Sequence, residues 1–268
     1  MTDTQYATSA DGTRIAYETT GRGPSLVLVD GALCQRSMGP ARGLAKQLAD
    51  RFAVVAYDRR GRGESGAGET AYDVQREIED LAAVLAAVGG HAHVFGSSSG
   101  AALALEAARQ GLPIDRLALY EAPFILDDTH PANPIDLPQQ LKTMVDAGDR
   151  GKAVKTFMHV VGAPAPMIAI MPLMPVWKKL TGVAHTLSYD MAFVVPFEQG
   201  QPLPEGHFAG VSATTLAIAG GKSPTYMRNA QAAIAEQLPN GRLVSLPGQT
   251  HMIRAKVTGP VLAEHFAG

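Results

Sequence analysis

Short apolar runs alternate along this chain with longer stretches of helical periodicity, and this rhythm restricts the possible fold more than any other feature. The runs are compact, rich in β-branched residues and bounded by turn residues, as in strands buried on both faces of a sheet. Strands that alternate with helices predict a mostly parallel sheet with helices on both faces, which is an α/β fold. The expected strands are residues 5–8, 14–18, 25–29, 52–57, 93–95, 116–120, 214–219 and 242–246, the first two forming a hairpin, and the expected helices are residues 74–88, 101–108, 226–238 and 261–266.

The rhythm lapses once, over residues 122–206. This segment is rich in proline and methionine and holds the only tryptophan, Trp177. A segment inserted between two strands predicts a cap over the carboxyl edge of the sheet, where open α/β folds bind ligands. We therefore divide the chain into a core, residues 1–121 and 207–268, and an inserted cap or lid, residues 122–206.

Residues 160–177 reach the length of a membrane-spanning helix and carry no charge. Prolines interrupt them repeatedly and would leave backbone carbonyls unsatisfied in a bilayer, so we expect the apolar lining of the cap and no integral membrane segment. The net charge of −2 predicts no nucleic-acid partner. A single cysteine, Cys34, and a polar start without a signal peptide predict a cytoplasmic protein.

The strongest chemical signal is Gly96-Ser97-Ser98-Ser99-Gly100. An expected strand runs directly into this motif and an expected helix runs directly out of it. A G-x-S-x-G sequence in that context indicates a nucleophile elbow, in which a strained turn exposes the central serine. The pattern therefore predicts Ser98 as a nucleophile.

A serine nucleophile needs a base and an acid, and when the serine stands on such an elbow they follow it along the chain in the order acid, histidine. His251 lies just after the last expected strand and fits the base, and we interpret the seven other histidines as structural. The loop after residues 214–219 usually supplies the acid, but here it has no carboxylate. Glu121 instead ends the preceding strand, where a carboxylate can orient His251. Asp127 and Asp128 remain alternatives for the acid.

Two backbone N–H groups should stabilise a developing oxyanion. One belongs to Ser99, the residue after the nucleophile, and the other to the loop that contains Gly31 and Ala32. The glycine-rich turn at residues 58–66 contains G-x-G-x-x-G, but no helix opens on it, so it does not indicate a dinucleotide site. The sequence has no motif typical of a metal or nucleotide site, and we expect no cofactor and no metal.

These motifs resemble the α/β-hydrolase family over nearly the whole chain. Glu121, the Asp30-Gly31 pair and the Gly-x-Ser-Ser-Gly elbow resemble in particular the zearalenone-degrading lactonase group. In that group a Ser-Glu-His triad opens a macrocyclic lactone, and a tryptophan of the cap packs on the substrate. By motif match, the resemblance implies roles for Ser98, Glu121 and His251, and Trp177 carries over less directly because the cap sequence diverges.

We therefore predict a carboxylic ester hydrolase of the esterase or lactonase type, acting through an acyl-enzyme on a fairly bulky apolar small molecule. Flexible methionine and flat aromatic side chains suit an apolar pocket, and the expected lining residues are Trp177, Met158, Met174 and Tyr189. Two alternatives stay open. The chain could be a non-catalytic ligand-binding protein with this fold, or a C–C hydrolase or lyase that uses the same site.

Overall fold

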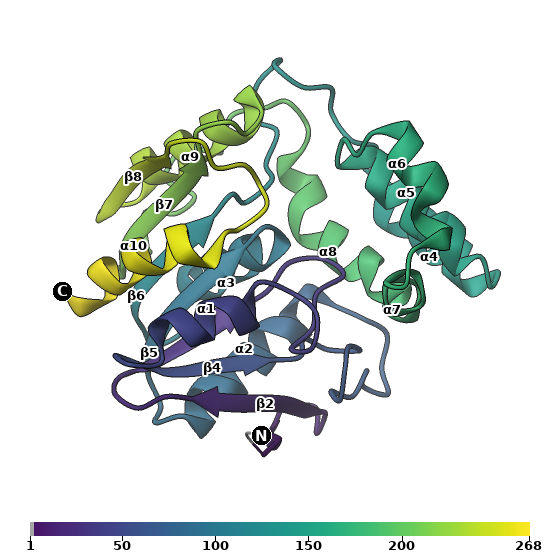
Figure 1. Ribbon diagram of the computed structural model, residues 1–268. Helices are drawn as coiled ribbons and strands as arrows, with labels where there is room; N and C mark the ends of the chain where they lie inside the picture. The colour runs from purple at the N-terminus through teal and green to yellow at the C-terminus, as the bar shows by residue number, and fades with distance from the viewer. Residues whose placement is uncertain (1–2) are drawn as a thin grey trace.

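Eight strands form a single twisted sheet in the computed structural model, which describes residues 3–268 (Figure 1). The strand order is β1-β2-β4-β3-β5-β6-β7-β8. The pairs β1–β2 and β2–β4 are antiparallel, and all the other pairs are parallel. The α/β fold expected from the sequence is confirmed. The strands are β1 (Gln5–Thr8), β2 (Arg14–Thr20), β3 (Ser25–Val29), β4 (Ala53–Tyr57), β5 (Ala92–Ser97), β6 (Ile114–Tyr120), β7 (Thr214–Gly220) and β8 (Gly241–Leu246).

Helices cover both faces of the sheet and bury its apolar side chains in two separate cores. One face is covered by α1 and α10, which also pack against each other, and the other by α2, α3 and α9. The sequence prediction omitted α1, although its buried residues, Ala41, Leu44, Ala45 and Leu48, follow helical spacing. These helices are α1 (Ala41–Leu48), α2 (Val74–Ala87), α3 (Ser99–Arg109), α9 (Thr225–Gln237) and α10 (Ala255–Ala267).

Between β6 and β7 the chain leaves the sheet and forms a group of short helices, which Figure 1 shows set to one side of the strand ends. Helix α8 returns toward the sheet and packs against α3, whereas α4 and α5 lie further out. We call residues 122–206 the inserted segment. Its helices are α4 (Leu137–Asp146), α5 (Arg150–Val160), α6 (Ala165–Ile170), η1 (Met171–Leu173), α7 (Trp177–Gly182), η2 (Ala184–Thr186), α8 (Leu187–Val194) and η3 (Val195–Phe197).

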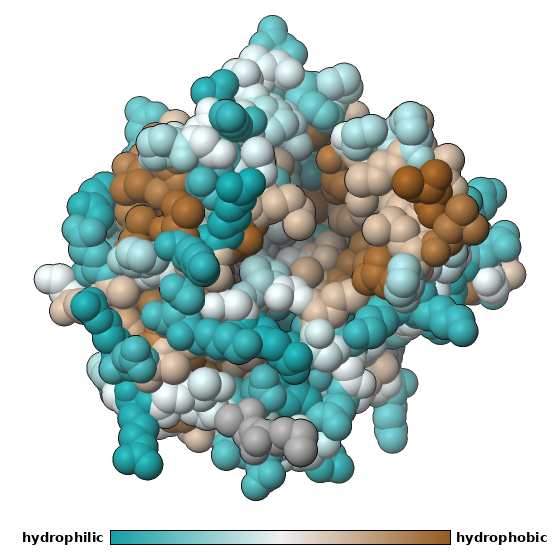
Figure 2. Space-filling view, viewed as in Figure 1, coloured by the Kyte–Doolittle hydropathy of each residue, from teal (hydrophilic) through white to brown (hydrophobic). Residues whose placement is uncertain are grey.

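The uncharged stretch over residues 160–177 becomes short helices separated by prolines. Within residues 3–268, no helix has both the length and the apolar character needed to cross a membrane. Only the beginning of this stretch lines a cavity, and several of its large apolar side chains lie at the surface, where Figure 2 shows a hydrophobic area. These exposed side chains are Val161, Met167, Ile170, Leu173 and Met174.

Candidate active site

Ser98 stands between the end of β5 and the start of α3, in a backbone conformation that L-residues rarely adopt. Its φ is 55° and its ψ is −127°. Close packing on both sides imposes this turn: a Cβ at Gly96 would lie 2.5 Å from the Gly100 carbonyl oxygen, and one at Gly100 would lie 2.2 Å from the Val29 carbonyl oxygen. The two glycines therefore let the strand, the turn and the helix approach closely enough to present the serine at the carboxyl edge of the sheet.

His251 lies in the loop after β8, and its side chain reaches Ser98. Its Nε2 is 3.2 Å from Ser98 Oγ. Its Nδ1 is 2.9 Å from Oε2 of Glu121. When Nδ1 carries a proton and donates a hydrogen bond to the carboxylate, Nε2 is free to accept a hydrogen bond from the Ser98 hydroxyl group. The geometry thus suits Nε2 to removing the proton from Ser98.

Glu121 directly follows β6 and is fully buried. Its φ of 49° turns the side chain back over the sheet edge. Oε1 accepts a 2.5 Å hydrogen bond from the backbone N–H of Gly220, at the end of β7. One oxygen is therefore fixed by the neighbouring strand while the other holds His251, so the carboxylate has little freedom to move.

The alternative acids have other surroundings. Asp127 accepts hydrogen bonds from Thr129 and from the side chain of Asn229, and Asp128 is exposed. Within residues 3–268, His251 shares a hydrogen bond with neither of them. The structure therefore brings Glu121, and not Asp127 or Asp128, into line with His251 and Ser98.

The loop after β3 crosses directly over Ser98. A Cβ at Gly31 would lie 2.8 Å from Ser98 Cβ, so only glycine allows this approach. Gly31, Ala32 and Ser99 all line the same cavity as Ser98. Ser99 is the first residue of α3, so its N–H has no acceptor within the helix. These positions suit backbone donors to a developing oxyanion. Asp30, the residue before Gly31, is not part of the lining of this cavity.

A buried charge network lies beneath Ser99 and was not foreseen from the sequence. Asp190 of α8 accepts hydrogen bonds from Ser99 Oγ at 2.6 Å, Arg59 at 2.7 Å and Arg62 at 2.6 Å. Burial alone would raise the pKa of Asp190, but the Arg62 and Arg59 guanidinium groups hold it below its ordinary value. Glu77 pairs with the other edge of Arg59. The sequence feature that could have indicated this network is Asp190, the one acidic residue in the mostly apolar sequence of α8.

A cavity of about 630 Å³ opens above Ser98, between the strand ends and the inserted segment. Figure 2 shows the hollow and the hydrophobic residues around it. Both parts of the chain contribute apolar walls, among them Ile125, Phe157, Met158, Met191, Val194 and Met227. No arginine or lysine occurs among the lining residues, all of which belong to the described part of the chain. The volume fits a small molecule.

Of the four residues expected to contact the substrate, the structure places one in the lining of the cavity and three outside it. Met158 lines the cavity, whereas Trp177, Met174 and Tyr189 are not part of its lining. The Trp177 ring packs near Gly151 on α5. Tyr189 stacks on Tyr72 with ring centroids 3.8 Å apart. Met174 is 44% exposed. Trp177 therefore packs within the inserted segment, Tyr189 packs against the core, and Met174 is partly exposed at the surface.

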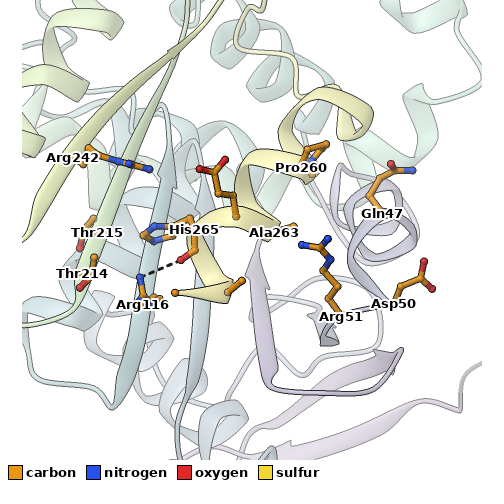
Figure 3. A pocket seen from close by; sticks show the side chains of 14 residues that line it. Gln47, Asp50, Arg51, Arg116, Thr214, Thr215, Arg242, Pro260, Ala263 and His265 are labelled. Carbon is orange, nitrogen blue, oxygen red and sulfur yellow. Dashed lines mark hydrogen bonds between the residues drawn. The ribbon is translucent and has the colours of Figure 1, made fainter.

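A second hollow, of about 870 Å³, lies where β7 begins and beside α10 (Figure 3). Arg116 donates there to the carbonyl oxygen of His265 at 3.2 Å. Burial lowers the pKa of His265 to about 4, and its Nε2 donates to the Leu117 carbonyl oxygen. The lining of this second hollow, which lies wholly within residues 3–268, contains no serine or cysteine. Within the same residues, no group of three His, Cys, Asp or Glu side chains could hold a metal ion. The smaller cavity is therefore the candidate active site.

Comparison with known proteins places these features in a wider group. Residues 32–255 match the sequence model described as "Alpha/beta hydrolase family". The chain is 28% identical over 158 residues to the uncharacterized hydrolase YraK of Bacillus subtilis, covering 58% of this chain and 57% of that protein. It is 35% identical over 119 residues to the N-formylmaleamate deformylase of Pseudomonas putida, covering 43% of this chain and 44% of that protein. The matches thus span about half the length of these curated relatives.

Solved structures match over nearly the whole chain. An alpha/beta hydrolase from Sphaerobacter thermophilus is 45% identical, with a TM-score of 0.89 and coverage of 98% of this chain and 100% of that one. An enol-lactonase from Burkholderia xenovorans is 18% identical, with a TM-score of 0.72 and coverage of 98% and 100%. At that identity, the second likeness concerns the fold alone.

Proposed function

Because the chain belongs to the α/β-hydrolase family, we propose that it is a serine hydrolase that cleaves a carboxylic ester or lactone of a fairly bulky apolar substrate. The observation that carries this proposal is the continuous line from Glu121 through His251 to Ser98, with contacts of 2.9 and 3.2 Å. That line has the donors and acceptors that acyl transfer requires.

The proposed reaction has two halves. Ser98 Oγ attacks the carbonyl carbon while His251 Nε2 takes its proton, and the Ser99 and Ala32 N–H groups stabilise the oxyanion. His251 then gives that proton to the departing alkoxide, which leaves an acyl-enzyme. A water molecule loses a proton to His251, attacks the acyl carbon and releases the acid, and Ser98 regains its proton. Glu121 keeps its charge and stabilises the imidazolium in both halves.

The cavity supports the proposed substrate class. Its apolar walls favour bulky acyl or lactone groups over short, hydrated ones. We propose that the inserted segment acts as the cap of this cavity, since it supplies a large part of the lining. A macrocyclic lactone, which the zearalenone-degrading group opens, belongs to this class of molecules and is therefore one of the compounds to test. The lone Cys34 is consistent with a reducing cytoplasm, where we propose that the reaction occurs.

The test combines labelling with turnover. The purified protein is treated with a fluorophosphonate, and the modified peptide is identified by mass spectrometry, with a Ser98→Ala variant as control. A panel of alkyl esters, small lactones and a macrocyclic lactone is then assayed. We expect labelling at Ser98 and turnover that falls by several orders of magnitude in Ser98→Ala. A protein that is neither labelled nor active would be a binding protein, and one active only on C–C substrates would be a C–C hydrolase.

A further inference from the structure

Glu198 is a buried carboxyl group in the wall of the candidate active site that the reaction above does not use. It follows η3, lines the cavity and is 4% exposed. Its Oε2 accepts a 2.9 Å hydrogen bond from the side-chain amide of Asn133. The backbones of the two residues are also joined, because the Asn133 N–H donates to the Glu198 carbonyl oxygen. The side chain is therefore held in place at the cavity wall.

The carboxyl group has hydrogen-bonding capacity that the protein leaves unused. Within residues 3–268, Oε1 of Glu198 receives no hydrogen bond, and no arginine or lysine forms an ion pair with the group. Asp190, the other acidic residue in the lining, has two arginine partners. Burying a carboxyl group without such partners costs free energy unless another donor completes it. Burial accordingly raises the pKa of Glu198 to about 7, against the opposing effect of Asn133.

The titratable groups near Glu198 include Tyr226 and His130. Tyr226 and His130 both line the cavity, with ring centroids 4.3 Å apart. Burial, together with the charges of Glu198 and Glu121, raises the pKa of Tyr226 to about 12, so its phenol stays neutral. His130 directs Nδ1 at the Pro131 carbonyl oxygen, 2.8 Å away. Glu198 therefore lies near a neutral phenol and an imidazole, and the lining contains no arginine or lysine.

We propose that Glu198, held by Asn133, forms a subsite for a hydroxyl group that the substrate carries in addition to its reacting carbonyl. This rests on the proposed hydrolase function and narrows the substrate class to hydroxylated apolar esters or lactones. A hydroxyl donates to the ionised carboxylate and accepts from the protonated form, so it suits both states. A substrate carboxylate would find no arginine or lysine in the lining, and an ammonium group would lose its hydration in an apolar cavity.

The test uses matched substrates on the full-length protein. We compare p-nitrophenyl esters of straight-chain acids with their ω-hydroxy, ω-amino and ω-carboxy analogues over a series of chain lengths. In the unmodified protein, one chain length should favour the hydroxy ester in kcat/KM, and the carboxy ester should be the poorest substrate. Glu198→Leu should lower kcat/KM for the hydroxy ester about tenfold or more relative to the plain ester of equal length. Glu205→Gln, a change at an exposed position in the same segment, should leave the ratio unchanged.

Binding separates this inference from the proposed function. In Ser98→Ala protein, calorimetry measures the affinity for the same hydroxy and plain esters without turnover. A Glu198-dependent preference for the hydroxy ester without hydrolysis in the unmodified protein would remove the hydrolase proposal and keep the subsite. Hydrolysis with equal losses for both esters in Glu198→Leu would overturn the subsite. If Glu198→Leu does not fold, Glu198→Gln and Asn133→Ala replace it. A ratio of kcat/KM for the hydroxy ester to that for the plain ester that stays unchanged in both variants would likewise overturn the subsite.

Discussion

The hydroxyl group of Ser99 donates a 2.6 Å hydrogen bond to Oδ1 of Asp190, and so joins the residue after the candidate nucleophile to helix α8 of the inserted segment. Asp190 is itself fixed by the buried guanidinium groups of Arg59 and Arg62. The first turn of α3 is therefore held from one side by the sheet and from the other by the inserted segment. Since the Ser99 N–H is the proposed oxyanion donor, this contact should influence the chemical step.

Ser99→Ala removes that contact and leaves the ion pairs of Asp190 in place. A less rigid oxyanion donor stabilises the transition state less than the bound substrate, so kcat should fall about tenfold with a small change in KM. Steady-state kinetics on an ester measure the split. Ser188→Ala, on α8 like Asp190, is the matched control, because among the described residues its hydroxyl bonds only to the His185 carbonyl oxygen. A rise in KM with unchanged kcat would contradict a positioning role for Ser99.

Glu121→Gln keeps the size of the side chain but removes the charge that faces His251. An amide can present its N–H₂ group to Nδ1 and so favour the wrong imidazole tautomer, which should lower kcat by roughly 10³ to 10⁴. The control is Asp127→Asn, because that carboxylate bonds to Thr129 and Asn229 instead. Its turnover should stay close to that of the unmodified protein. Strong loss in Asp127→Asn and little in Glu121→Gln would move the acid into the inserted segment.

Asp30 should make the stability of the protein depend on pH. Its carboxyl group is buried against Gly39, and burial raises its pKa to about 7, above the ordinary value of 3.8. The folded state therefore binds a proton more tightly than the unfolded state. This stabilisation is complete below about pH 4 and is lost as the pH rises through about 7.

The check is the free energy of unfolding, measured by urea denaturation at pH 5 and at pH 8 for the unmodified protein and for Asp30→Asn. The unmodified protein should lose roughly 3 kcal/mol more than the variant between these two values. The comparison uses the change with pH, so a constant offset from the new amide group cancels. Equal losses in the two proteins would show that Asp30 does not titrate in this range.

Selectivity for bulky substrates should depend on Met158 and not on Trp177. Met158→Trp would fill part of the cavity, so kcat/KM should fall about tenfold or more for a bulky ester and much less for an acetate. Trp177→Ala should reduce stability, because the ring packs within the inserted segment, and should change the two esters alike. Parallel assays of both esters decide between them. A selective loss for bulky esters in Trp177→Ala would restore the ring to the substrate site.

The strand and helix pattern was sufficient for the fold class, and together with the G-x-S-x-G motif it predicted Ser98, His251 and Glu121 at one edge of the sheet, with Asp127 and Asp128 open as alternatives to Glu121. Ser98 and Glu121 directly follow strands and His251 lies in the loop after another, and parallel strands bring their carboxyl ends to one edge of a sheet. Residues that follow these strands in the sequence are therefore expected near one another at that edge of the sheet. The missing carboxylate after β7 was informative for the same reason, since the N–H of Gly220 now binds Glu121 at that place.

Side chains of the inserted segment follow no such rule. Its helices are short and separated by prolines, so their sequence does not fix which side chains face the cavity, another helix or solvent. Tertiary packing alone therefore directed Trp177 and Tyr189 away from the cavity and Met158 into it. It likewise placed Asp190 against Ser99 and, among the described residues, left Glu198 without an arginine or lysine partner, because residues that meet there are far apart in the chain and no local pattern encodes their contact.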